Sequence, residues 1–372
     1  MKKALLAAML LSPGFAAHAQ SSVTLYGRLD AGLQYVTGVP TGHGANGQAT
    51  GSTHSFQQES GDGGINLWGL KGVEDLGGGN RIIFQLEGQI LLNTGNVAGE
   101  PGQLFNRWAA LGPSSDRYGT LMLGRELFIS NGVWDFDPFW QDPWGSASLV
   151  RGRNWPISSN NISYRSPKFG GFEVYGQYSL SNGTSWNGNG TTAQGRGDGI
   201  QITYTSALFQ IRGIYDEMRN PADGLLHNPY SFSREYTAAA NIFLGQFKLQ
   251  AVYQASRTSH AVTDPGANQP STSTDLEWGA VTWQATPAAV LIAAVYHVNA
   301  NHGGGNGSMY TVGGSYNLSR RTLLTFQLAT VQNSKTANFS LFANGAGTSA
   351  ASGNPLVGHS QSGAYAGIQH YF

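Results

Sequence analysis

The chain has 372 residues and carries 21 Lys and Arg against 21 Asp and Glu, so its formal net charge at pH 7 is zero. Without a basic excess, the sequence argues against nucleic-acid binding through neutralisation of phosphates. It contains no cysteine, which excludes a disulfide framework, a zinc thiolate site and a thiol nucleophile.

Residues 1–20 have the three regions of a secretory signal peptide. Two lysines precede a short apolar run, and small residues surround the expected cleavage point after residue 19 or 20. The apolar run is too short to cross a bilayer as a helix. We therefore expect an exported protein over residues 21–372. It keeps 19 Lys and Arg, because two of the 21 leave with the signal, and its net charge is near −2.

The first mature segment, residues 23–35, alternates with a period of two, which predicts a β-strand. Its apolar face carries Val23, Leu25, Gly27, Leu29, Ala31, Leu33 and Tyr35. Its polar face carries Thr24, Tyr26, Arg28, Asp30 and Gln34. The same pattern returns in "FEVYGQY", "FKLQAVYQ", "YTVGGSYNL" and "TLLTFQLAT". No segment of comparable length shows a helical stripe, so the mature chain is predicted to be all-β.

Two kinds of connection separate the expected strands. Seven short turns are expected at 74–80, 113–120, 166–172, 205–209, 244–247, 285–290 and 317–321. Eight long polar and glycine-rich loops are expected near 37–63, 93–104, 126–157, 181–198, 217–233, 256–274, 299–307 and 333–358. Long loops at one end and short turns at the other predict a 16-stranded antiparallel transmembrane β-barrel.

A soluble β-sandwich is the rival fold, and its second face would be covered by short polar residues. Here the apolar face instead carries tyrosines at the strand ends, as expected at membrane interfaces. These are Tyr35, Tyr178, Tyr204, Tyr215, Tyr253, Tyr310 and Tyr316. The last segment, "GAYAGIQHYF", alternates and ends on Phe372. It is expected to pair with the first strand and close the barrel.

The sequence resembles the trimeric general porins of Gram-negative bacteria, specifically those of β-proteobacteria. The resemblance rests on "SSVTLYGRLDAGLQY", "WGLKGVEDLGGGN", "SYRSPKFGGFEVYGQYS", "GGSYNLSRRT" and the terminal Phe372. It implies a homotrimer in the outer membrane, with a third extracellular loop folded into the pore. It also implies a cluster of wall arginines and lysines facing acidic residues of that loop, which sorts solutes by charge and size.

The resemblance also implies which residues form the basic wall. Arg28 matches the wall position of the first strand, and the alternation independently points it inward. Arg107 matches a second wall position, with Trp108 and Ala110 expected on the lipid face. Lys71 points inward if its apolar strand neighbours face lipid.

The chain departs from the family pattern at two wall positions. Family members commonly place an arginine where this chain has Leu67. They also commonly carry one just before the stretch that reads "WPISSNNISY" here, and the nearest bases are Arg151 and Arg153, a few residues upstream. Compared with the family pattern, the positive charge at the position of Leu67 is therefore lost, and the one before "WPISSNNISY" is displaced upstream.

The third loop contains "WDFDPFWQDPW", residues 134–144, with five aromatic rings and three aspartates. One interpretation packs most rings against the inner wall to hold the loop in place. A second lines the constriction with Trp134, Phe136, Trp140, Asp135, Asp137 and Asp142. Strand-like alternation would put Asp135 and Asp137 on one side and Trp134 and Phe136 on the other. A third interpretation is that the rings form a track along which sugars or aromatic solutes pass. A calcium site of the EF-hand type is not supported, because the stretch lacks the glycine and the terminal glutamate of that loop.

These observations predict a passive, water-filled channel for small hydrophilic solutes and ions, with no cofactor, no metal and no catalysis. A substrate-specific channel built on the aromatic loop is the alternative. A barrel that acts as an enzyme or adhesin is a further hypothesis, but the sequence lacks the motif that such an activity needs. The expected partners are two further copies of the chain, outer-membrane lipid and lipopolysaccharide, the transported solutes, and the barrel-assembly machinery through Phe372.

Overall fold

The computed structural model describes residues 22–45, 47–99, 102–180, 195–259 and 271–372. The predicted signal peptide lies outside the described residues. The strands are β1 (Ser22–Thr41), β2 (Gly51–Glu59), β3 (Leu67–Gly77), β4 (Asn80–Gln89), β5 (Trp108–Ser115), β6 (Gly119–Leu127), β7 (Ile157–Arg165), β8 (Phe172–Ser179), β9 (Gly197–Thr205), β10 (Phe209–Met218), β11 (Arg234–Leu244), β12 (Phe247–Arg257), β13 (Ser273–Gln284), β14 (Ala289–Ala300), β15 (Gly305–Asn317), β16 (Thr322–Asn333) and β17 (Gln361–Tyr371). Three short 3₁₀ helices are η1 (Ile129–Phe136), η2 (Ser146–Leu149) and η3 (Ala350–Ser352).

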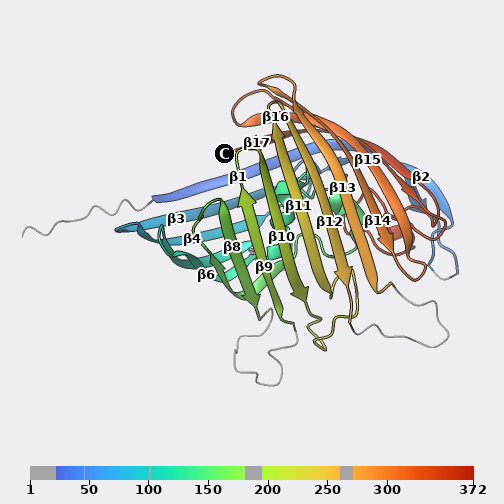
Figure 1. The fold of residues 1–372 in the computed structure, drawn as a ribbon. Helices are drawn as coiled ribbons and strands as arrows, with labels where there is room; N and C mark the ends of the chain where they lie inside the picture. The colour runs from blue at the N-terminus through green and yellow to red at the C-terminus, as the bar shows by residue number, and fades with distance from the viewer. Residues whose placement is uncertain (1–21, 46, 100–101, 181–194, 260–270) are drawn as a thin grey trace, which may run out of the picture.

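The strands form one closed antiparallel ring (Figure 1). Each strand from β3 onward pairs with the next, and β17 pairs with β1 from Arg28↔Tyr371 to Val36↔Gly363. The predicted pairing of the last strand with the first is therefore confirmed. Phe372 continues this seam, because its backbone exchanges two hydrogen bonds of 3.2 Å with Gly27. Its ring lies over Gly27, where an added Cβ would meet the ring at 2.2 Å.

Strands β2 and β3 share one position in the ring. The first half of β1 pairs with β3 from Ser22 to Arg28, and its second half pairs with β2 from Gly32 to Thr41. The seventeen described strand segments thus make sixteen positions, as the sequence predicted. The expectation of an unbroken loop over 37–63 was wrong, because β2 lies within it. Its sequence, "GSTHSFQQE", has Phe56 as its one large apolar residue and shows no apolar alternation.

Residues 60–66, between β2 and β3, turn toward the lumen and are mostly buried. The backbone N–H of Gly63 donates to the carboxylate of Asp30 at 3.2 Å, and Gln369 donates to the Gly63 carbonyl at 3.1 Å. The Ile65 carbonyl accepts from Arg28 Nε at 2.9 Å. Because Asp30, Gln369 and Arg28 are inward residues, this segment holds the Arg28 side chain in the lumen.

All seven predicted short turns join consecutive strands at one end of the ring. The turn from β3 to β4 contains three successive glycines, residues 77–79, with φ of 84°, 62° and 78°. A side chain would be strained at these angles, which explains the glycine run. The strand ends that flank the long loops lie at the other end, as expected for an outer-membrane barrel.

Alternation along the strands separates two faces. Apolar side chains such as Leu25, Leu33, Val295 and Leu328 are exposed on the outer face, while Gln34 is buried on the inner face. Outward apolar residues suit contact with lipid acyl chains. None of the described helices is long and apolar enough to cross a membrane.

Candidate functional site

The segment between β6 and β7, residues 128–156, is called L3 here, and it lies inside the ring of strands. Its η1 helix packs against β8 to β12 and its η2 helix against β14 (Figure 1, teal helices within the ring). Trp278 Nε1 donates to the carbonyl of Phe136 at 3.0 Å, and Thr311 Oγ1 donates to the carbonyl of Trp144 at 2.7 Å. Trp278 and Thr311 are inward residues of β13 and β15, so L3 occupies the lumen.

The five rings of L3 divide into two groups. Phe136, Phe139 and Trp144 are 0%, 2% and 0% exposed, and they pack in one apolar cluster with inward residues of β13 to β16. That wall contributes Leu276, Trp278, Ala280, Ile292, Ala294, Tyr296, Val298, Met309, Ala329 and Val331. Trp140 is 50% exposed, and Trp134 is only partly buried against the cluster. Three rings therefore anchor L3, and two face the open side of the lumen.

The expected alternation of aspartates and aromatics along L3 was wrong. Trp134 and Asp135 both line an open recess, whereas Phe136 and Asp137 both turn to the wall. The physical reason is that Trp134, Asp135 and Phe136 lie in the 3₁₀ helix η1, where a two-residue alternation does not hold, and that Asp137 follows the end of this helix. Trp140 also has a left-handed φ of 54°, a conformation that tertiary contacts must impose on so large a residue.

Asp137 organises L3 rather than facing water. Its carboxylate accepts hydrogen bonds from the backbone N–H of Phe139 and of Ser146, both at 2.9 Å, and from the Tyr296 hydroxyl at 2.8 Å. It is 1% exposed. Phe136 and Asp137 therefore lie on the side of L3 that faces the barrel wall. The sequence had predicted that both would face the pore.

Asp142 lines the same recess as Trp134 but is almost fully buried. Burial raises the pKa of its carboxyl well above the usual range, because the charged form loses its hydration. Arg28 opposes this rise in pKa, while the negative charges of Asp30 and Asp137 add to it. Asp142 is therefore neutral over a wider pH range than an exposed aspartate.

A recess of about 480 Å³ brings the predicted basic wall and L3 together. Its lining includes Arg28, Leu67, Glu87, Arg107, Trp108, Trp134, Asp135, Trp140 and Asp142. Arg107 Nε donates to Glu87 Oε1 at 2.7 Å, and its guanidinium lies 5.8 Å from the centre of the Trp134 ring. The structure thus brings six of the predicted pore residues to one place.

Arg28 and Lys71 lie on the same inner face of β1 and β3. Arg28 is directly opposite Leu67, and Lys71 Nζ lies 5.3 Å from the centre of the Tyr26 ring. Leu67 therefore occupies an uncharged lumen position beside Arg28. Among the ion pairs of the described residues, none involves Arg28 or Lys71.

The expected lipid orientation of Trp108 and Ala110 was wrong. Trp108 is directly opposite Glu87, and Ala110 is directly opposite Gln85. Residues directly opposite in an antiparallel pair share a face, and Glu87 lines the recess, so both point inward. Arg107 precedes β5 and reaches Glu87 from outside the regular alternation, which explains the error.

Sequence reasoning missed two further lumen arginines, Arg165 and Arg212. They line a recess of about 210 Å³ that shares Trp134 and Asp135 with the first. Arg212 Nη1 contacts Asp135 Oδ2 at 2.6 Å, and Arg165 Nη1 contacts Glu173 Oε1 at 2.6 Å. Alternation in β10, where Phe209 and Ile211 are exposed, could have predicted that Arg212 points inward.

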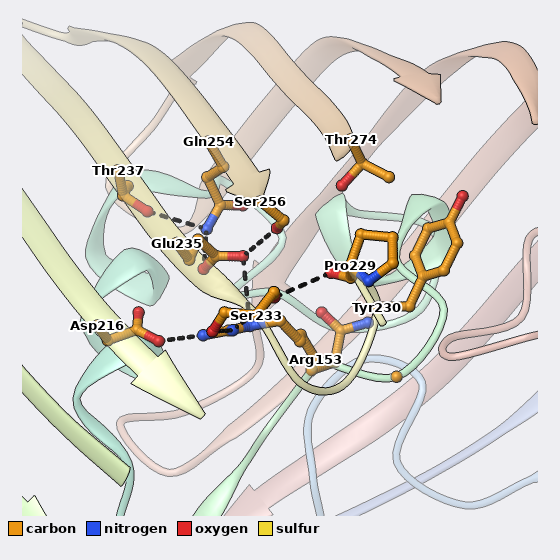
Figure 2. Close-up of polar contacts among 12 residues, drawn as sticks. Arg153, Asp216, Pro229, Tyr230, Ser233, Glu235, Thr237, Gln254, Ser256 and Thr274 are labelled. Carbon is orange, nitrogen blue, oxygen red and sulfur yellow. Dashed lines mark hydrogen bonds and ion pairs between the residues drawn. The ribbon is translucent and has the colours of Figure 1, made fainter. Parts of the chain in front are cut away.

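Arg151 and Arg153 lie outside both recesses. Arg153 is 3% exposed and forms ion pairs with Asp216 of β10 and, at 3.5 Å, with Glu235 of β11 (Figure 2). Its guanidinium also donates to the Ser233 carbonyl at 2.8 Å. Arg151 donates to Asn338 at 2.6 Å. These two arginines fix the end of L3 to the wall and to neighbouring loops, so the pore-lining position predicted for them is not where the structure puts them.

The profile of the Gram-negative porin family matches residues 4–336. The chain belongs to this family. This porin is 30% identical to outer membrane porin protein 32 of Delftia acidovorans over the full length of both chains. It is 37% identical to an outer membrane porin protein of Bordetella pertussis over 190 residues, about half the length of each protein.

Solved structures share the fold of this porin. The anion-selective porin from Comamonas acidovorans superposes with a TM-score of 0.75 at 24% identity, over 95% of this chain and 100% of that one. OmpT of Vibrio cholerae superposes with a TM-score of 0.61 at 13% identity, over 95% and 98% of the two chains. The chain is an outer-membrane porin, a passive diffusion channel of the Gram-negative cell surface.

Proposed function

We propose that the channel is narrowest where L3 faces β1, β3 and β4. The lining there is formed by Arg28, Lys71 and Arg107 on the wall and by Trp134, Asp135 and Trp140 on L3. The single observation that carries this proposal is the 480 Å³ recess, which joins five of these six side chains; Lys71 lies on the same inner face. Phe136, Asp137, Arg151 and Arg153 support L3 from its wall side and do not meet solutes. Asp142 lines the recess but is almost fully buried.

We propose that this narrowing favours small anions over small cations. The charges that meet water are what a passing ion senses, and they are mostly positive. Lys71 is exposed and Arg28 is partly exposed. The Arg165 side chain is 46% exposed, and its partner Glu173 is only 16% exposed. On the acidic side, Asp135 is 59% exposed but held by Arg212, while Asp137 and Asp142 are buried. The preference is moderate, because Leu67 carries no charge and Glu87 neutralises Arg107.

A track for sugars or aromatic solutes needs several rings in line along the water path. Only Trp134 and Trp140, of the five rings in residues 134–144, are open to the recess. The other three are part of the apolar cluster. The geometry therefore supports a general diffusion channel rather than a substrate-specific one.

Reversal potentials in planar bilayers under a KCl gradient test the narrowing. Arg28→Ala and Arg107→Ala are expected to lower the chloride preference, the second because it leaves Glu87 uncompensated. Asp135→Asn is expected to raise the chloride preference. Arg81→Ala is the control, since Arg81 pairs with Asp116 near the short turns and is outside both recesses. Unchanged potentials in all three variants would refute the assignment, and current block by a sugar or aromatic acid at low concentration would favour the specific channel.

We also propose that the porin assembles as a homotrimer and that Phe372 is read by the barrel-assembly machinery. The support for the trimer is family membership, together with the broad apolar outer face of β1 and β17, where Leu33 and Ile368 are exposed. Opening in steps of three in single-channel records is the expected result. Single-step openings would contradict the trimer.

A further inference from the structure

The inward segment between β2 and β3, residues 60–66, is called the flap here, and it is pinned at both ends. At its first residue, Ser60 Oγ accepts hydrogen bonds from the backbone N–H of Leu92 at 2.7 Å and from Asn66 Nδ2 at 2.9 Å. At its last residue, the Asn66 side chain accepts from the backbone N–H of Asp30. The two ends of the flap are therefore fixed to β1 and to the residues that follow β4.

The middle of the flap is rich in glycine. Three of its five residues, 61–65, are glycine, and Gly61 has a left-handed φ of 98°. Three hydrogen bonds, described above, hold it to the wall. Gly64 packs closely on Arg28, because a Cβ added there would lie 2.8 Å from Arg28 Cζ. A glycine-rich middle between two fixed ends can swing toward the water of the lumen without breaking the neighbouring strands.

Asp62 lies in the middle of the flap and is 8% exposed. Among the described residues, its Oδ2 has no hydrogen-bond partner. The Trp144 indole of L3 lies beside it and favours its charged form, but Trp144 Nε1 is likewise without a partner in the described part of the chain. Glu59 of β2, Asp30 of β1 and the Tyr365 hydroxyl of β17 also face it. A carboxylate buried among acids and without donors is unfavourable, so Asp62 holds a proton while the flap is docked.

Asp142 of L3 is a second buried acid near this contact. It is 2% exposed, and its Oδ2 also lacks a hydrogen-bond partner among the described residues. The charged and titratable groups that face it are Arg28, Asp30, Asp137 and Asp62. Asp137, which is buried in the same loop, accepts three hydrogen bonds. Donors are thus supplied to the carboxylate that anchors L3, whereas the contact between L3 and the flap suits neutral carboxyls.

We propose that the flap is a pH-sensitive latch on L3, docked while the Asp62 carboxyl carries its proton and released into the lumen when that proton passes to water. Release takes the Ile65 carbonyl away from Arg28 Nε, and it enlarges the recess, whose lining includes Ile65 and Asp142. It also brings the negative charge of Asp62 into the water path. Conductance therefore increases, and the chloride preference decreases, as the flap opens.

The flap opens as pH rises, because the docked form binds a proton that the released form does not. Burial, with the negative charges of Glu59 and Asp30, raises the pKa of Asp62 to about 8 in the docked flap. In the released flap the carboxyl faces water and regains its usual pKa of about 4. The equilibrium therefore shifts toward release by about tenfold per pH unit between about pH 4 and pH 8, and it levels off above that range.

The latch rests on the proposed narrowing only for its effect on current and selectivity. Hydrogen exchange of the flap reports its motion wherever the channel is narrowest. The Arg28 and Arg107 variants described above test the narrowing at constant pH. Failure of the latch and failure of the proposed narrowing are therefore distinguishable.

Hydrogen exchange of residues 60–66, read by mass spectrometry on the full porin in detergent, measures the release. Asp62→Asn has nearly the same shape and cannot ionise, so its flap stays docked at every pH. Both proteins are compared at the same pH, so the intrinsic pH dependence of exchange cancels. We expect the ratio of exchange rates, unmodified porin over Asp62→Asn, to increase by about tenfold per pH unit between pH 5 and 8, and to stay constant from pH 8 to 9.

Asp75→Asn is the matched control, because Asp75 is an exposed aspartate at the short-turn end. Its flap should exchange like that of the unmodified porin at every pH. In planar bilayers, single-channel conductance should increase from pH 5 to 8 in the unmodified porin and stay constant in Asp62→Asn. An exchange ratio that does not change with pH would overturn the latch. Constant conductance in both proteins, despite a rising exchange ratio, would overturn its effect on the pore and place the narrowing elsewhere.

Discussion

The two sides of the lumen are built from the same alternating strands but have opposite character. On the side of β13 to β16 the inward positions are mostly apolar, and the rings of L3 pack on them without solvent. On the side of β1, β3 and β4 the inward positions carry Arg28, Lys71 and Glu87, and Arg28 and Glu87 line an open recess. The difference shows that L3 is held by one half of the wall and leaves a charged passage along the other.

The packing of L3 on the apolar wall can be tested at Trp144, whose indole is fully buried. We expect Trp144→Ala to lower the free energy of unfolding by about 3 to 5 kcal/mol, the usual cost of removing a large buried aromatic. Trp140→Ala, at a half-exposed ring of the same loop, should change it by less than about 1 kcal/mol. Urea unfolding in lipid vesicles, followed by circular dichroism, measures both, and similar losses in the two variants would contradict the anchoring role of Trp144.

The ionic anchor of L3 can be tested at Arg153. Replacing it by methionine leaves Asp216 and Glu235 buried without a cation, and we expect a loss of about 3 kcal/mol. Adding Asp216→Asn and Glu235→Gln should recover part of that stability, because the uncompensated charges are then removed. Arg81→Met, at an exposed pair with Asp116, should cost at most about 1 kcal/mol. An equal loss in the Arg153 and Arg81 variants, seen by the same unfolding measurement, would show that the pair does not anchor L3.

Asp135 is an exposed aspartate of L3 and Asp142 a buried one, so their variants compare the two kinds of carboxylate. At neutral pH, Asp135→Asn should shift the reversal potential toward chloride. Asp142→Asn should shift it less, because the Asp142 carboxyl is almost fully buried and burial raises its pKa, which disfavours the charged form. The raised folded-state pKa also means that Asp142 destabilises the fold progressively as pH rises above the usual carboxyl range. Asp142→Asn should therefore add stability mainly at higher pH, and a stability gain confined to acid pH would contradict the burial effect.

The smallest expected effect is at Leu67, directly opposite Arg28. Leu67→Arg adds a lumen cation to the recess and should raise the chloride preference modestly, whereas Leu67→Gln should leave it nearly unchanged. Reversal potentials distinguish the two. An equal shift in both variants would mean that polarity rather than charge is sensed at this position.

The barrel was predictable from the sequence because strand alternation, turn composition and loop length are local signals. The seven turns and the closing pair of β1 with β17 follow from them. Strand β2 was missed, since its polar residues show no apolar face. The inward positions of Arg28 and Lys71 also followed from alternation.

The interior of L3 was less predictable, because its shape depends on residues far away in the sequence. The burial of Asp137 requires Tyr296, and that of Arg153 requires Asp216 and Glu235. The 3₁₀ geometry of η1 also removes the two-residue period on which the sequence prediction relied. Local pattern could identify the loop and its chemistry, but it could not assign each ring and carboxylate to wall or water.

The hydrogen bonds that fasten L3 join partners 142, 159 and 167 residues apart in the chain. L3 therefore emerges long before the strands on which it rests, and contacts of such long sequence separation form late in folding. Until β13 to β16 are in place, Phe136, Phe139 and Trp144 have no apolar surface to cover them. We therefore expect L3 to take its place in the lumen only after β13 to β16 have formed.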